Sequence, residues 1–163
     1  MESPAAEVEH YLYPGLIYAQ KGTCFVTTVL GSCISVCLWD PVTKTGGINH
    51  FMLPLWNGDG LPSPKYGNIA IRKLIEKMLA LGCRKHDLKA KIFGGGAVIQ
   101  TSCGLLNVGE RNIVMAEDML ADENIPIISR EVGGNYGRRL IFCTATGNVL
   151  LKKIPKTSFL NYQ

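Results

Sequence analysis

The chain has 163 residues, of which 47% are hydrophobic and 18% are charged, and its formal net charge is +4. This length suits one compact domain, and this composition excludes a disordered polymer. Because the positive charge is small and spread along the chain, we do not expect nucleic-acid binding to be the main function.

Residues 1–13 are expected to form a loosely ordered arm that precedes a single domain over residues 14–163. The N-terminus carries acidic residues where a signal peptide would carry basic ones, and no apolar signal segment follows. Six cysteines are too few for a disulfide scaffold in a chain of this size. We therefore expect a cytoplasmic protein with free thiols.

The stretch from Gly22 to Trp39 contains no charged residue and is long enough to raise the question of a membrane span. Polar residues and glycines interrupt it, and its β-branched residues favour strands, so we expect no membrane insertion. Two apolar strands are predicted over residues 23–30 and 34–39, separated by a break at Gly31-Ser32. A third is predicted over residues 48–53, after a turn that extends from Asp40-Pro41 to Gly46-Gly47.

Two helices are predicted in the rest of the chain. The first begins at Ser63 or at Asn68, ends near Gly82, and carries an apolar stripe at helical spacing: Ile71, Leu74, Ile75, Met78 and Leu79. The second covers about residues 110–123. Further strands are expected at residues 88–93, 127–131, 139–144 and 149–154. Because strands outnumber helices and many are joined as hairpins, the pattern predicts an α/β sandwich with a largely antiparallel sheet.

Cys33 is the first candidate for chemistry, because it follows Gly31-Ser32 at the break between two apolar strands. A sharp turn there would present the sulfur and leave the backbone N–H groups of Ser32 and Cys33 free to bind an oxyanion. A nucleophile in acyl transfer needs both features. The alternative is a small buried hydrophobe, which is the commoner role of a lone cysteine.

His50 lies inside the apolar strand that is expected to fold back on the strand after Cys33. An imidazole within reach of a thiol can take its proton and stabilise the thiolate; the alternative is a buried histidine bonded to a carbonyl. Thr27 is a candidate third member, whose hydroxyl could accept the other imidazole N–H and fix the tautomer. Thr28 points to the opposite face of the strand, and strand propensity alone would explain both threonines.

Other patterns are weaker. The glycines at residues 94–96 lack the spacing of a phosphate-binding loop, so close backbone packing is the better explanation. The spacing of cysteines and histidines gives no zinc site, and we expect neither a metal nor a cofactor.

The segments TTVLGSCISVCLWDP and GGINHFMLP resemble the signature of the chemoreceptor glutamine deamidase family, CheD. The combination of GSC with a histidine seventeen positions later is its specific part. The likeness covers about residues 14–154 and continues through KYGNIAIRKLIEKMLALG, KIFGGGAVI, NVGERNI, IPIISREVGGNYGRRLIF and TGNVLL.

The resemblance implies a cytoplasmic enzyme that converts receptor glutamines to glutamates and releases ammonia. It implies that the catalytic residues are Cys33, His50 and Thr27, and that the fold is similar to the cysteine-hydrolase fold of deamidating bacterial toxins. Its implied partners are the cytoplasmic helical region of methyl-accepting chemoreceptors and the phosphatase CheC, which family members can also bind. Two alternatives stay open: a non-catalytic adaptor that binds receptor or CheC, and a thiol hydrolase of small amides or peptides.

Overall fold

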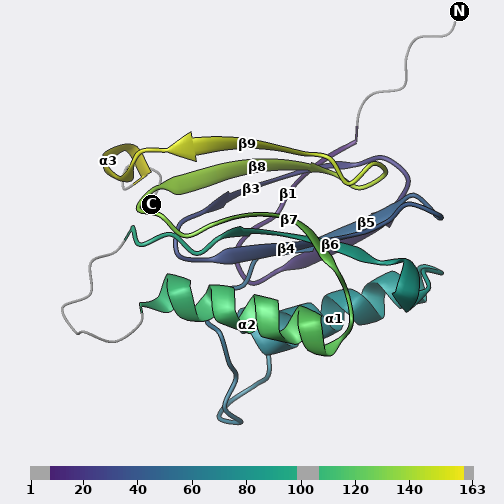
Figure 1. Cartoon of the computed structure of the whole chain (residues 1–163), viewed down its shortest axis with the longest axis horizontal. Coiled ribbons are helices and arrows are strands. Elements are labelled where there is room, and N and C mark those ends of the chain that lie inside the picture. The colour runs from purple at the N-terminus through teal and green to yellow at the C-terminus, as the bar shows by residue number, and fades with distance from the viewer. Residues whose placement is uncertain (1–7, 99–106, 160–163) are drawn as a thin grey trace, which may run out of the picture.

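The computed structural model describes residues 8–98 and 107–159, which form three stacked layers (Figure 1). A four-stranded sheet lies on one side of a five-stranded sheet, and two long helices cover the other face of the five-stranded sheet. The layers arise because each sheet and each long helix buries its apolar side against a neighbour.

The four-stranded sheet has the order β1-β3-β8-β9 and consists of β1 (Glu9–Tyr11), β3 (Phe25–Leu30), β8 (Gly137–Cys143) and β9 (Val149–Ile154). The five-stranded sheet has the order β2-β5-β4-β6-β7 and consists of β2 (Ile17–Lys21), β5 (Thr45–Asn49), β4 (Ile34–Asp40), β6 (Lys89–Gly94) and β7 (Ile127–Val132). The helices are α1 (Gly67–Ala80), α2 (Val108–Asp122), the short α3 (Lys156–Phe159) and a 3-10 turn, Lys85–Asp87.

Both sheets are mixed, which corrects the prediction of a largely antiparallel sheet. In the described residues, β1 pairs with β3 and β6 pairs with β7 in parallel, while the other strand pairs are antiparallel. A parallel pair needs a long crossover between its strands. The connection between β6 and β7 contains α2. The connection between β1 and β3 contains β2, which belongs to the other sheet.

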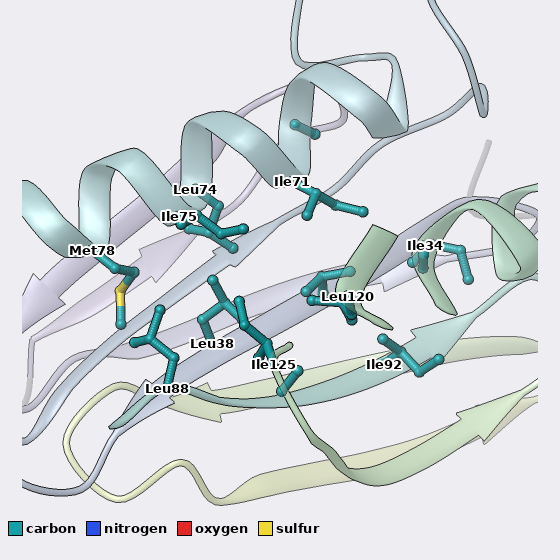
Figure 2. Close-up of a cluster of buried hydrophobic side chains, with 14 of the residues drawn as sticks. Ile34, Leu38, Ile71, Leu74, Ile75, Met78, Leu88, Ile92, Leu120 and Ile125 are labelled. Carbon is teal, nitrogen blue, oxygen red and sulfur yellow. The ribbon is translucent and has the colours of Figure 1, made fainter. Parts of the chain in front are cut away.

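The uncharged stretch of the sequence contains all of β4 except its last residue, Asp40, and this strand is buried on both faces. Ile34, Val36 and Leu38 face the helices, whereas Cys37 faces the four-stranded sheet. Figure 2 shows the helix side of this core, where residues of α1 meet residues of β4, β6 and α2. A central strand covered on both sides needs a continuous apolar sequence. No helix in the described part of the chain is long and apolar enough to span a membrane.

Of the two predicted starts of the first helix, Ser63 is wrong and Asn68 is one residue late. The helix begins at Gly67, because the preceding residues are used in pairing: Lys65 O accepts N–H groups from Met52 (2.8 Å) and Leu53 (3.0 Å). Gly67 packs on the ring of Phe51, where a Cβ would come within 2.8 Å of the ring. Of the predicted stripe, four side chains are buried and Leu79 is 41% exposed.

The third strand begins and ends earlier than predicted. Gly46 and Gly47 were expected in a turn but lie inside β5. Gly46 is pressed against the backbone of Thr144, and a Cβ on Gly47 would come within 2.7 Å of Leu74. These glycines are required by close packing between layers, which sequence periodicity does not record.

Part of the expected N-terminal arm belongs to the fold. Residues 9–11 form β1 beside β3, and Leu12 is fully buried between the sheets. The expectation of a loosely ordered arm is therefore wrong for these residues, because their pairing and burial hold them in place. Residues 1–7 lie outside the described part of the chain.

Candidate active site

Cys33 lies in the turn where the chain passes from β3 in one sheet to β4 in the other. The glycines of residues 94–96 support this turn: Gly95 N–H donates to Cys33 O and Gly96 N–H donates to Gly31 O, both at 2.9 Å. Gly94 has φ +107°, and a Cβ there would collide with Cys33 O. The triple glycine is thus explained by close backbone approach, as the sequence indicated.

The backbone N–H groups of Ser32 and Cys33 donate to no carbonyl among the described residues. The Cys33 N–H instead lies beside its own thiol, which it stabilises in the ionised form. Such unused donors at a nucleophile are what an oxyanion site requires. The proposal that Ser32 and Cys33 bind the oxyanion stays a prediction, and this geometry supports it.

Cys33 and His50 lie on the same face of the five-stranded sheet. Ile34 and Phe51 form an antiparallel bridge, in which each N–H donates to the other residue's carbonyl, at 3.1 and 3.0 Å. Cys33 directly precedes Ile34, and His50 directly precedes Phe51. Such positions are diagonal neighbours, whose Cα atoms lie roughly 7–8 Å apart. Both side chains point between the sheets, since Cys33 packs on the inter-sheet cluster and His50 reaches Thr28 of β3.

The imidazole of His50 is held by one specific contact: its Nδ1 lies 2.7 Å from Oγ1 of Thr28. The same hydroxyl lies 2.8 Å from the carbonyl oxygen of Leu12. A hydroxyl has one proton, and a carbonyl can only accept, so Thr28 donates to Leu12 and accepts the N–H of Nδ1. This network puts the proton of a neutral imidazole on Nδ1 and leaves the Nε2 lone pair available as a base.

The predicted contact of Thr27 with His50 is wrong, because Thr28 makes it. Residues of β3 alternate between the two faces, and Thr27 points out of the sandwich with Phe25 and Val29. His50 comes from the opposite sheet and can reach only the inward face. A usable signal was present in the sequence, since Thr28 shares its face with three apolar residues, Cys24, Val26 and Leu30, all fully buried.

The site rests in its uncharged form. Burial raises the pKa of the Cys33 thiol to about 11, with its own backbone N–H opposing the rise. Burial lowers the pKa of His50 to about 4. In the described residues no hydrogen bond joins thiol and imidazole. The thiolate–imidazolium pair expected from the sequence is therefore not the resting state, and His50 is placed to take the proton only when the two side chains close.

A pocket of about 270 Å³ opens at Cys33. Its walls are the turn at Ser32-Cys33, Met52 and Leu53, the backbone at Gly96, and the first residues of α2. This is smaller than the roughly 300–1,000 Å³ of pockets for drug-sized ligands and suits one side chain. The N-terminal end of α2 carries partial positive charge, which favours negative charge that develops at Cys33. Within residues 8–98 and 107–159, no cluster of three metal-ligating side chains occurs.

Comparisons with known proteins identify relatives of the whole domain. The family model described as "CheD chemotactic sensory transduction" matches residues 52–153. The chain is 49% identical to "Probable chemoreceptor glutamine deamidase CheD" of Trichlorobacter lovleyi over 143 residues, 88% of this chain and 89% of that protein. Proteins with the same name from Sulfurimonas denitrificans and Saccharophagus degradans are 44% and 38% identical, over 91% and 96% of this chain and 96% and 75% of theirs.

One solved structure, the hypothetical protein YfiH of Bacillus licheniformis, is similar over 66% of this chain and 46% of its own, with 17% identity and a TM-score of 0.45. That score is too low to establish a shared fold. The family assignment therefore rests on the sequence relatives. The match to the Trichlorobacter protein covers all but about 20 of the 163 residues, so even if all of these precede the match, it includes Cys33 and His50. On the family model and these relatives together, the chain belongs to the CheD family.

Proposed function

We propose that the chain is a protein-glutamine deamidase that converts glutamine side chains of chemoreceptors to glutamates. The observation that carries this proposal is the placement of Cys33 and His50 on one face of a sheet, with Nε2 of His50 left free by the bond to Thr28. The names of the relatives, which specify chemoreceptor glutamine, supply the substrate class.

In the first half of the reaction, Cys33 Sγ attacks the carbon of the glutamine carboxamide while its proton passes to His50 Nε2. The amide oxygen becomes an oxyanion, which the N–H groups of Ser32 and Cys33 bind. The imidazolium then donates its proton to the amide nitrogen, the C–N bond breaks, and ammonia leaves. The product on the enzyme is a glutamyl thioester.

In the second half, His50 Nε2 takes a proton from water, and the resulting hydroxide attacks the thioester carbon. The C–S bond breaks, the imidazolium returns a proton to the sulfur, and the receptor leaves with a glutamate. A neutral imidazole can start both halves, which agrees with the lowered pKa of His50. Thr28 keeps the ring in the required tautomer throughout.

The substrate fits the pocket at Cys33, whose volume of about 270 Å³ admits one amide side chain while the polypeptide that bears it stays outside. We propose the cytoplasmic helical region of methyl-accepting chemoreceptors as this polypeptide, a cytoplasmic location for the enzyme, and CheC as a second partner. We also propose that the two-sheet core has the cysteine-hydrolase architecture of deamidating toxins.

The decisive experiment incubates the full chain with purified cytoplasmic fragments of several chemoreceptors and analyses them by peptide mass spectrometry. We expect glutamine-to-glutamate conversion at specific positions with the backbone uncut, which separates a deamidase from a thiol peptidase. Cys33→Ala should abolish conversion and keep the fold. Conversion by Cys33→Ala at the wild-type rate would reject the thiol mechanism.

One observation favours the adaptor alternative, namely the high pKa of the Cys33 thiol, which leaves the resting sulfur protonated. An adaptor would bind receptor fragments and leave every glutamine unchanged. The same incubation decides between the two, because binding without conversion across the whole panel of fragments supports the adaptor.

A further inference from the structure

We infer that Asn112 is a positioning residue for the deamidation proposed above: it ties the turn that carries Cys33 to the segment that follows His50. Asn112 lies on α2 and is fully buried. Its Nδ2 donates to the carbonyl of Ser32 at 3.0 Å and to the carbonyl of Met52 at 3.1 Å. Ser32 directly precedes the nucleophile, and Met52 lies two residues after the base.

The two carbonyls need this donor because the strand pairing stops beside them. The last pair between the two segments is Ile34 with Phe51. In a continued antiparallel ladder, the next bond would run from Leu53 N–H to Ser32 O. Leu53 N–H instead donates to Lys65 O at 3.0 Å. A primary amide has two N–H donors, so one side chain can serve both the Ser32 carbonyl, which lacks its ladder partner, and the Met52 carbonyl, which accepts no backbone N–H among the described residues.

The position of Asn112 on its helix indicates a specific use. Ala116 and Leu120 follow it at intervals of four residues, and all three are fully buried against the sheet. An apolar residue would continue this stripe, whereas a buried amide is costly unless it is hydrogen-bonded. Nδ2 has its two partners, while Oδ1 has none among the described residues. The contacts of Nδ2 therefore account for a polar residue here.

The same helix forms part of the pocket. Its first residues, Val108 and Gly109, line the cavity at Cys33, one turn before Asn112. Asn112 thus links three parts of the site: the nucleophile turn, the segment of the base, and the pocket wall. Because thiol and imidazole are diagonal neighbours with no hydrogen bond between them in the described residues, their approach depends on how these two segments are held.

The test compares Asn112→Leu and Asn112→Asp with wild type on the receptor fragment that wild type converts. Leucine has a similar size and no donor, and we expect kcat to fall about 100-fold with KM nearly unchanged, since small misplacements of reacting groups cost this much. Aspartate can donate one hydrogen bond when protonated and none when ionised. Burial raises the pKa of such a carboxyl, so the activity of Asn112→Asp relative to wild type should rise as the pH falls.

Thr144→Val is the matched control for lost buried hydrogen bonds. Thr144 is fully buried and its Oγ1 accepts the N–H of Cys24 at 2.8 Å, but it packs on Gly46, at the opposite end of β4 from Cys33. We expect this variant to lose stability and keep its kcat. If Asn112→Leu keeps the wild-type kcat, or if both asparagine variants lose activity only in proportion to their unfolded fraction, the inference is overturned.

Hydrogen exchange gives a readout that does not depend on activity. The N–H groups of Ile34 and Phe51 bond each other's carbonyls next to the two contacts of Asn112. Asn112→Leu should speed their exchange at least tenfold, and Thr144→Val should not. Unchanged exchange in Asn112→Leu overturns the inference even if wild type deamidates; absence of deamidation by wild type on all fragments instead overturns the proposed function.

Discussion

Thr28 on β3 and His50 on the opposite sheet meet between the two sheets, with Oγ1 of the threonine 2.7 Å from Nδ1 of the histidine. The carbonyl oxygen of Leu12 accepts a hydrogen bond from the Thr28 hydroxyl at 2.8 Å, so this hydroxyl must accept, and not donate, in its bond to His50. A residue near the N-terminus therefore helps decide which imidazole nitrogen is basic. The predictions below follow from this network and from the groups around Cys33.

Replacing Thr28 by valine should lower kcat roughly 10- to 100-fold, a part of the 10²–10⁴ that general acid–base catalysis supplies. Valine has the same shape and cannot accept the N–H of Nδ1, so the ring loses its fixed tautomer. Thr27→Val is the matched comparison one residue away. Since Thr27 faces outward, we expect near wild-type kcat for that variant; the reverse order of effects would support the role that the family resemblance implies for Thr27.

Alkylation of Cys33 by iodoacetamide should be slow at neutral pH. With a thiol pKa of about 11, the thiolate fraction, and with it the rate, should rise about tenfold per pH unit from pH 7 to pH 10. Mass spectrometry of peptides that contain Cys33 measures this rate, and Cys33→Ala identifies the signal. An alkylation rate that does not change with pH above pH 7 would contradict the uncharged resting state and support a preformed ion pair.

The stability of the protein should fall in mild acid because of His50. The pKa of this residue is lowered to about 4 in the folded state, against 6.5 for an unperturbed histidine. Between these values the unfolded chain binds a proton and the folded chain does not, so the free energy of unfolding rises with pH. The contribution is complete above pH 6.5, is lost as the pH falls toward 4, and amounts to about 3 kcal/mol.

Denaturant unfolding of wild type and His50→Gln between pH 4 and pH 8 measures this contribution. Carboxyl groups that affect stability at the acid end of this range are common to both proteins; for Glu131, burial alone would raise the pKa, but its bonds to Arg138 and Tyr136 lower it. The difference between the two curves isolates His50. Parallel curves would show that His50 is not buried as a neutral group.

Gly94→Ala should reduce activity more than its loss of stability explains. Gly94 and Gly22 both have positive φ, +107° and +84°, so alanine is strained at either position, at about 1–2 kcal/mol. Only at Gly94 would the new Cβ strike the carbonyl of Cys33, whereas Gly22 has no neighbour within 4 Å. Thermal unfolding should show a loss in both variants, larger in Gly94→Ala because of this clash, and the kcat of the folded protein should fall only in Gly94→Ala. Equal kcat values would mean that the turn tolerates displacement.

The sequence by itself identified the strands around Cys33, the apolar stripe of α1, and both members of the proposed pair, because periodicity and turn residues are local properties. It also separated the two faces of β3 by alternation. The apolar residues that share a face with Thr28 indicated which face meets the other sheet, but the histidine contact was assigned to Thr27 on the opposite face. The start of β5, which contains Gly46 and Gly47, was placed too late because these glycines are required by contacts with Thr144 and Leu74, which are distant in sequence.

The tertiary structure alone decided how the site is held. Leu12 and Thr28 lie in paired segments of one sheet, His50 reaches Thr28 from the other sheet, and Asn112 reaches Met52 from the helix layer. It also decided the charge state of the pair, because burial sets the pKa of a thiol or an imidazole and depends on every residue packed around it. Local sequence specifies which elements form, while contacts between layers specify which side chains meet and whether they carry charge.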